Sequence, residues 1–234
     1  DANTTSSNNT AIGTYALTNN TTGANNVAIG YNASADCTTD GSQNVAVGVE
    51  ALKANTAGTY CVAIGYEALN DNTTGNYNVA VGGRALDLNT TGNYNTAVGV
   101  NALGSTTTAS HNTAIGFQSL VAAAGGQYNN AFGSYTLDSV TTGDANSAIG
   151  YFAGADITTG GHNTLLGHGC GANVVGNNNN TVVGSAALTV GDCANTTLMG
   201  YAAGYTNATD GFTAFGYSAG YNNTTGGFNT AIGF

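Results

Sequence analysis

Cysteine and histidine are the side chains of this sequence best suited to act as nucleophiles, bases or metal ligands, and they are few. The 234 residues include four cysteines and three histidines: Cys37, Cys61, Cys170, Cys193, His111, His162 and His168. There is no Cys-x-x-Cys motif, so we expect no metal site. The histidines have no Ser/Asp or Cys partners in a catalytic arrangement. The sequence therefore predicts a protein that is not an enzyme and that has no catalytic residues and no cofactors.

The four cysteines form two pairs with the same offset along the repeat described below. Cys37 and Cys61 are separated by one repeat plus six positions, and so are Cys170 and Cys193. Four cysteines allow three connectivities, and the shared offset favours the disulfides Cys37–Cys61 and Cys170–Cys193. Because disulfides persist in oxidising compartments, this pairing predicts a secreted, extracellular or cell-surface protein.

Composition excludes several classes of function. Gly, Thr and Asn supply 36, 36 and 33 of the residues, charged residues are only 6%, and the net charge is −10. One Lys and one Arg cannot form the basic surface that nucleic acid requires. No apolar segment is long enough to cross a membrane as a helix. We therefore expect neither nucleic acid nor membrane insertion, and the acids to serve solubility.

A short motif repeats along the whole chain, and this repeat must determine where all the remaining residues lie. Thr/Val-Ala-Ile/Val-Gly or a close variant, such as Asn-Ala-Phe-Gly or Thr-Leu-Met-Gly, occurs fourteen times, from Gly13 to Gly233, at spacings of 16 to 18 residues. We number each repeat from its Gly as position 0. A period near 17 is too short for a helical hairpin but fits short strands joined by Gly- and Asn-rich corners. The prediction is all-β: a parallel β-solenoid of about 14 coils, in one domain over 1–234.

Stacking of identical coils would bring the same residue type into a column. Position −4 is Asn in 11 repeats, so we expect an internal ladder of amides, as in other stacked in-register strands. Its members are Asn9, Asn26, Asn44, Asn78, Asn95, Asn112, Asn129, Asn146, Asn163, Asn180 and Asn229.

A second group of asparagines lies in the proposed corners, at position +7. Asn20, Asn72, Asn89, Asn207 and Asn223 all belong to Asn-x-Ser/Thr sequons. A corner is a place where a glycan could project, so these are glycosylation candidates. The alternative is that Asn-Thr-Thr-Gly is simply good turn chemistry.

Two features predict association between copies. Positions −2 and −1 face opposite sides of a strand, yet both are apolar, which suggests the close approach of a second layer, either a neighbouring subunit or the opposite wall of a very flat coil. The sequence is also close to a whole number of repeats in length, and it shows no polar capping segment at either end. Because bare strand edges pair with other chains, we expect head-to-tail assembly into an open filament, unless the chain is a fragment whose caps lie outside it.

The segment Asn-Thr-Ala-Val-Gly-Val-Asn-Ala-Leu at 95–103, with its thirteen relatives, resembles the head repeats of trimeric autotransporter adhesins and of phage tail-fibre-like proteins. The resemblance covers essentially the whole chain. It implies a left-handed parallel β-roll, lateral association of three chains, and binding to host surfaces. The repeat is longer here, and neither a heptad stalk nor a membrane anchor is present. No functional residue carries over, because the matching positions are structural.

Two functions compete on this evidence. The first is a structural subunit of a secreted filament or adhesive surface fibre, with tyrosine columns at positions +1 and −5 available to stack on surface glycans; a receptor-binding head is its variant. The second is ice binding, because several antifreeze proteins are low-charge Thr-, Ala- and Asn-rich solenoids. Ice binding needs a flat, regular Thr array, and position −3 is its best source, although Val replaces Thr there in four repeats.

Overall fold

The chain folds as an all-β parallel β-solenoid of about 13 turns with a period of roughly 17 residues. The computed structural model describes residues 6–37 and 41–234, and the chain divides into two compact units, 1–117 and 118–234. The predicted fold class is confirmed, with the turn count one lower because fourteen motif strands mark the boundaries of about 13 complete turns. Within the described residues, no helix has the length and apolarity to cross a membrane.

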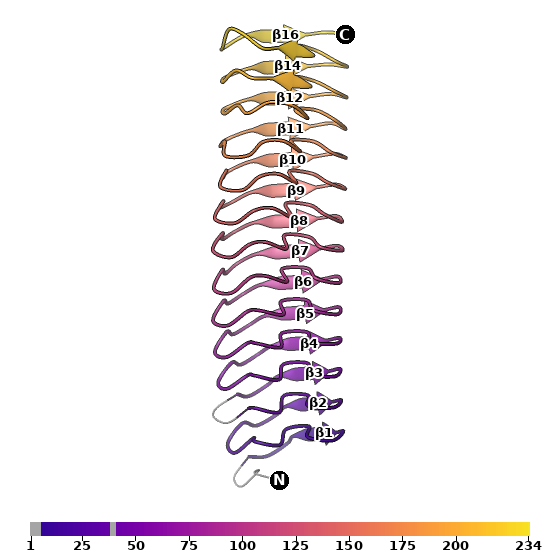
Figure 1. The fold of residues 1–234 in the computed structure, drawn as a ribbon, viewed down its shortest axis with the longest axis vertical. Helices are drawn as coiled ribbons and strands as arrows, with labels where there is room; N and C mark the ends of the chain where they lie inside the picture. The colour runs from indigo at the N-terminus through magenta and orange to yellow at the C-terminus, as the bar shows by residue number, and fades with distance from the viewer. Residues whose placement is uncertain (1–5, 38–40) are drawn as a thin grey trace. The chain divides into compact units, whose positions relative to one another are not determined.

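The first unit contains one three-residue strand per coil, and successive strands pair in parallel in chain order (Figure 1). The strands are β1 (Thr10–Ile12), β2 (Val27–Ile29), β3 (Val45–Val47), β4 (Val62–Ile64), β5 (Val79–Val81), β6 (Thr96–Val98) and β7 (Thr113–Ile115). Paired residues are 17 apart, except for an 18-residue step between β2 and β3. The register therefore pairs each residue of a motif strand with the residue at the same repeat position in the next coil.

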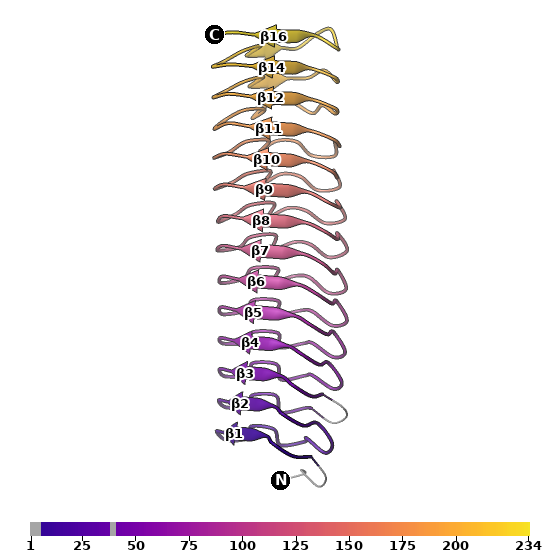
Figure 2. The ribbon, with the colours of Figure 1, turned by 180° about the vertical axis from the view of Figure 1, so that it is seen from behind.

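The second unit repeats this plan, and Figure 2 shows its strands from behind. Its strands are β8 (Asn130–Phe132), β9 (Ser147–Ile149), β10 (Thr164–Leu166), β11 (Thr181–Val183), β12 (Thr197–Met199), β13 (Thr206–Asn207), β14 (Thr213–Phe215), β15 (Asn222–Asn223) and β16 (Thr230–Ile232). β13 and β15 form a second, two-stranded parallel sheet. Steps of 16 residues occur from β11 to β12 and from β12 to β14.

The interior of each coil is filled by small and large apolar residues from fixed positions. In β2 to β12 and β14 the middle residue of the motif strand, usually Ala, is buried, and so is the Leu at position +4, as in Leu69 and Leu86. That Leu has a left-handed backbone, with φ of 52° at Leu69 and 51° at Leu86. A left-handed conformation is unfavourable for Leu, so burial of its side chain must offset the backbone strain.

The second unit exchanges large and small residues between two of these columns. Leu165 and Leu198 replace the usual Ala in the strand, while Gly154, Gly171 and Gly204 replace the Leu at position +4. A Cβ on Gly154 or Gly171 would meet the methyl groups of Leu165 at 2.6 and 2.8 Å. The strand leucine therefore occupies the space that the corner leucine fills elsewhere, and interior volume is preserved.

Candidate functional surface

The asparagines at position −4 line the interior edge of the coils and connect each coil to the next. From Asn26 to Asn180 those at this position are buried, whereas Asn9 is half-buried and Asn229 exposed. In each connection, Oδ1 accepts the backbone N–H of the next residue in the column, as from Asn95 to Asn78 at 2.9 Å. Nδ2 donates to a corner carbonyl of the next coil, as from Asn78 to Gly92 at 2.7 Å. The ladder is therefore mostly side chain to backbone, and it satisfies corner groups that would otherwise be buried without partners.

The glycosylation candidates do not project from a corner, and that prediction is wrong for four of the five. Asn20, Asn72, Asn89 and Asn207 are at most 1% exposed, and Asn223 is half-buried. They belong to a second internal column: Asn89 Nδ2 donates to Asn72 Oδ1 at 2.8 Å and to Gly92 O at 3.1 Å. The backbone at the corner turns their amides inward, where a folded coil has no room for a glycan.

The cysteines are all buried and free, so the predicted disulfides are absent. The partners of each proposed pair lie in different columns, where each replaces the usual residue. Cys37 occupies the Asn20 column and its Sγ donates to Gly41 O at 3.4 Å, whereas Cys61 occupies the ladder and donates to Gly75 O at 3.3 Å. Burial raises the pKa of the Cys61 thiol to about 11.

The second proposed pair is separated in the same way. Cys170 occupies the buried Ala column at position +3, and burial raises its pKa to about 12. Cys193 lies at the corner and accepts a hydrogen bond from Asn207 Nδ2 at 3.0 Å. All four sulfurs therefore act as protonated packing groups, and none is an activated thiolate.

His111 and His168 lie in columns of stacked aromatic rings. His111 stacks on Tyr94 at 4.9 Å between ring centroids, and His168 stacks on Tyr151 at 5.6 Å. The column of His111 continues through Tyr94 to Tyr77 and Tyr60, and further columns are Tyr201–Tyr217–Phe234 and Tyr205–Tyr221. Because neighbouring rings cover each other's faces, these columns present ring edges and hydroxyls outward, not the open faces on which a sugar stacks.

Charged groups are arranged away from the motif strands. Both cations are paired: Arg84 Nε lies 2.7 Å from Glu67 Oε2, and Lys53 Nζ lies 3.2 Å from Glu50 Oε1. Desolvation, and then the charges of Glu67 and Asp71, raise the pKa of Asp87 to about 6. Within the described part of the chain, no group of three or more His, Cys, Asp or Glu side chains could hold a metal ion.

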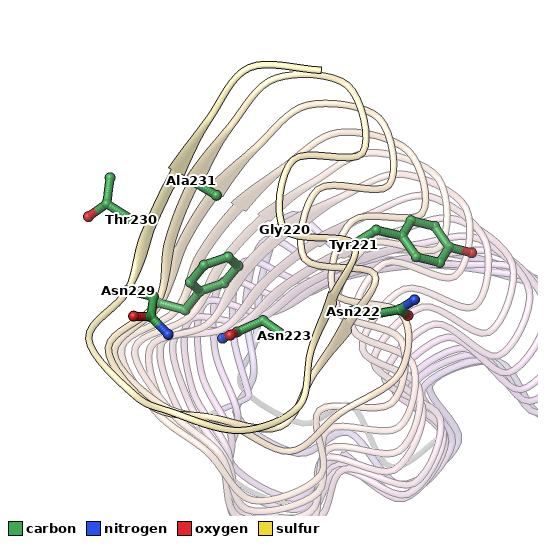
Figure 3. A pocket seen from close by; sticks show the side chains of 8 residues that line it. Gly220, Tyr221, Asn222, Asn223, Asn229, Thr230 and Ala231 are labelled. Atoms are coloured by element: carbon green, nitrogen blue, oxygen red, sulfur yellow. The ribbon is translucent and has the colours of Figure 1, made fainter.

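An open hollow of about 270 Å³ lies at the last coil, which contains β15 and β16 (Figure 3). Its lining is Phe212, Gly220, Tyr221, Asn222, Asn223, Asn229, Thr230 and Ala231. Ala231 and Asn223 point into the coil, whereas Thr230 and Tyr221 point away. None of the lining side chains is charged, and several of the lining residues, among them Asn222 and Asn229, are exposed to solvent.

The outward surface of the strands is the most distinctive exposed feature of each unit. In β2 to β12 and β14 the middle residue is buried, while the first and third residues are half-buried or exposed. We call these outward residues the sheet face. Its third-position column is apolar throughout, as at Ile64, Val98, Ile149, Leu166 and Met199. No motif strand contains a charged residue.

Comparison with known proteins adds no relative. No family model matches the chain, and neither the curated proteins nor the solved structures include a significant match.

Proposed function

We propose that this chain is a structural subunit of a secreted extracellular filament or adhesive surface fibre, and that copies associate through the sheet face. The observation that carries the proposal is the charge-free sheet face in each unit, with its outward column of apolar third-position residues. Monomeric soluble proteins rarely expose large contiguous apolar patches, and such patches usually mark interaction sites.

A second copy of the chain is the partner that best fits this face. The chain has 12 acids against two cations, so a random surface would repel another copy. All of these charges lie outside the motif strands, which leaves a surface where two copies can meet without burying a charge. The flat strands, with residues in register from coil to coil, also allow one copy to align along another.

Substitutions on the sheet face test the association. The double variant Ile64→Lys/Ile149→Lys places one ammonium on the face of each unit, and both side chains point outward, so folding should be retained. The matched control Thr74→Lys/Thr91→Lys adds the same charge at exposed corner positions. We expect wild type and control to form assemblies in sedimentation velocity and electron micrographs, and the face variant to remain monomeric. A wild-type protein that is monomeric at all concentrations would refute the proposal.

Location is a separate part of the proposal. The low charge and the repeated Asn- and Thr-rich corners are consistent with a fibre at the cell surface. Antibody labelling of intact source cells in electron micrographs tests it: labelling of surface fibres is expected, and label confined to the cell interior would contradict it.

Ice binding is a second candidate because of one specific observation. In the second unit, five consecutive motif strands present Thr outward at the first position, in direct register: Thr164, Thr181, Thr197, Thr213 and Thr230. The neighbouring column varies from Val183 to Met199 and Phe215, which breaks the regularity of the surface. Thermal hysteresis of purified protein, and its loss in Thr181→Lys, would favour this function over the fibre.

A further inference from the structure

The tyrosines at position −5 of the first unit are held in a regular stack by the backbone. The N–H of Tyr77 donates to Thr59 O at 3.0 Å, and that of Tyr94 donates to Asn76 O at 3.1 Å. Adjacent side chains therefore leave equivalent backbone positions and run parallel. The ring centroids of Tyr60 and Tyr77 are 4.9 Å apart at 4°, and those of Tyr77 and Tyr94 are 5.0 Å apart at 3°.

The asparagine column beside the stack strengthens this alignment. Thr59 N donates to Asn76 Oδ1 at 2.8 Å, and Asn76 N donates to Asn93 Oδ1 at 2.8 Å. These bonds join the residues that immediately precede the tyrosines in successive coils, so the coils cannot shift relative to each other without breaking them. The three phenols are also accessible: Tyr60, Tyr77 and Tyr94 are 47, 46 and 52% exposed.

We propose that this column is a site of oxidative cross-linking, in which dityrosine bonds form between Tyr60 and Tyr77 or between Tyr77 and Tyr94 and covalently join successive coils. In the second unit, Tyr201–Tyr217 at 5.1 Å and Tyr205–Tyr221 at 4.8 Å are equivalent pairs. The inference goes beyond the proposed function and does not depend on it. It also supplies the staple between coils that the free cysteines do not form.

The reaction needs a one-electron oxidant, which we take to be a peroxidase with hydrogen peroxide. Each of two phenols loses one electron and one proton, and the resulting phenoxyl radicals couple through the ring carbons ortho to oxygen. The two hydrogens on those carbons then transfer to the oxygens, which restores both aromatic rings. In total, two protons and two electrons leave the protein and reduce one hydrogen peroxide to two water molecules.

Geometry selects some tyrosines over others. Tyr135 stacks on Phe152, and Tyr66 lies under the Arg84 guanidinium at 5.8 Å. Neither of these two contacts is between parallel phenols. Tyr15 and Tyr31 meet edge to face at 72°, with centroids 6.0 Å apart. The stacked pairs should therefore react first when the oxidant is limiting.

The sequence provides a direct readout, because trypsin can cut it only after Lys53 and Arg84. Tyr77 lies in the fragment 54–84 and Tyr94 in 85–234, so a Tyr77–Tyr94 bond keeps these two fragments together after digestion under denaturing conditions. Dilute protein treated with peroxidase and limiting hydrogen peroxide should show dityrosine fluorescence, a monomeric band before digestion, and a joined fragment afterwards.

The variant Tyr77→Phe keeps the stacked ring but removes the phenol that both bonds share. We expect the joined fragment to disappear in this variant and to persist in Tyr66→Phe, a control that removes a phenol from the same tryptic fragment. The proposal is overturned if Tyr77→Phe still yields the joined fragment, if folded wild type forms no dityrosine, or if cross-links form only between chains.

Discussion

At the scale of single residues, the residue after a motif strand must be glycine where the backbone of the next coil approaches it closely. Gly82 has φ of +132°, and a Cβ there would lie 2.6 Å from Gly99 O in the next coil. Its neighbour Gly83 has open space, since the nearest atom to a Cβ would be Tyr66 O at 3.9 Å. The two glycines are adjacent in sequence but differ completely in what they tolerate.

We therefore predict that Gly82→Ala destabilises the protein by about 2 kcal/mol or more, from left-handed strain and the clash with the next coil. Gly83→Ala should change the free energy of unfolding by less than about 0.5 kcal/mol. Chemical denaturation of the two variants measures their free energies of unfolding. Equal losses in the two variants would show that the coils can move apart at Gly82 without cost.

A second prediction concerns Asp87, whose pKa is raised to about 6 chiefly because it is partly desolvated. Between the ordinary value of 3.8 and about 6, the folded state binds more protons than the unfolded state, so stability falls as pH rises. Asp87→Asn removes this penalty. Discounting for solvent screening, we expect the variant to be about 1 kcal/mol more stable at pH 7, and the difference to vanish near pH 4. A gain that is equal at both pH values would indicate packing instead of charge.

Residue chemistry was partly readable from the sequence. The Asn at position −4 could be recognised as structural because it recurs, but the period does not reveal which way a corner side chain points. Asn72 therefore looked like a glycan acceptor, although its amide is buried and donates to Asn55 Oδ1 at 2.9 Å. For Cys61, a shared offset suggested a disulfide, whereas its column shows that it replaces a ladder asparagine.

At the scale of elements, the exchange of Leu and Gly between columns makes a stability prediction. Gly171→Leu should clash with Leu165, which provides the three nearest atoms to a Cβ at that position, and Leu165→Ala should leave a cavity, each costing about 2–4 kcal/mol. The double variant recreates the combination found in most coils, with Ala in the strand and Leu at position +4. We expect it to be at least 2 kcal/mol more stable than the sum of the single effects, because the two sites are in contact. If thermal denaturation shows that the effect of the double variant equals the sum of the two single effects, the Leu and Gly do not share one space in the interior.

The strands themselves were predictable because their pattern is short and repeated. Thr/Val-Ala-Ile/Val followed by Gly marks β1 to β7 and β16, and variants of the same pattern mark the motif strands between them, as in Asn-Ala-Phe of β8 and Thr-Leu-Met of β12. The two-stranded sheet of β13 and β15 was not predicted, since Thr206–Asn207 and Asn222–Asn223 look like corner residues in sequence. They pair because the shorter 16-residue steps nearby bring their backbones into register.

At the scale of the whole molecule, composition and surface pattern have opposite effects on association. The net charge is −10, which favours separated copies, while the charge-free sheet face favours contact. Sequence periodicity indicated that both sides of each strand are apolar, but it could not say which side is covered. The structure buries the middle residue, such as Ala63, and leaves Ile64 outside, so it is the bulkier column that is available to a partner.

This opposition predicts how association responds to salt. Repulsion between acidic copies is long-range at 0.01 M salt, where the Debye length is about 30 Å, and is largely screened at 0.15 M, where it is about 8 Å. Apolar contact on the sheet face is not weakened by screening. We therefore expect the association constant from sedimentation equilibrium to rise about tenfold or more over this range, and Ile64→Lys/Ile149→Lys to remain monomeric throughout. An interface held by ion pairs would instead weaken with salt, so a falling association constant would place the contact on the charged corners and not on the sheet face.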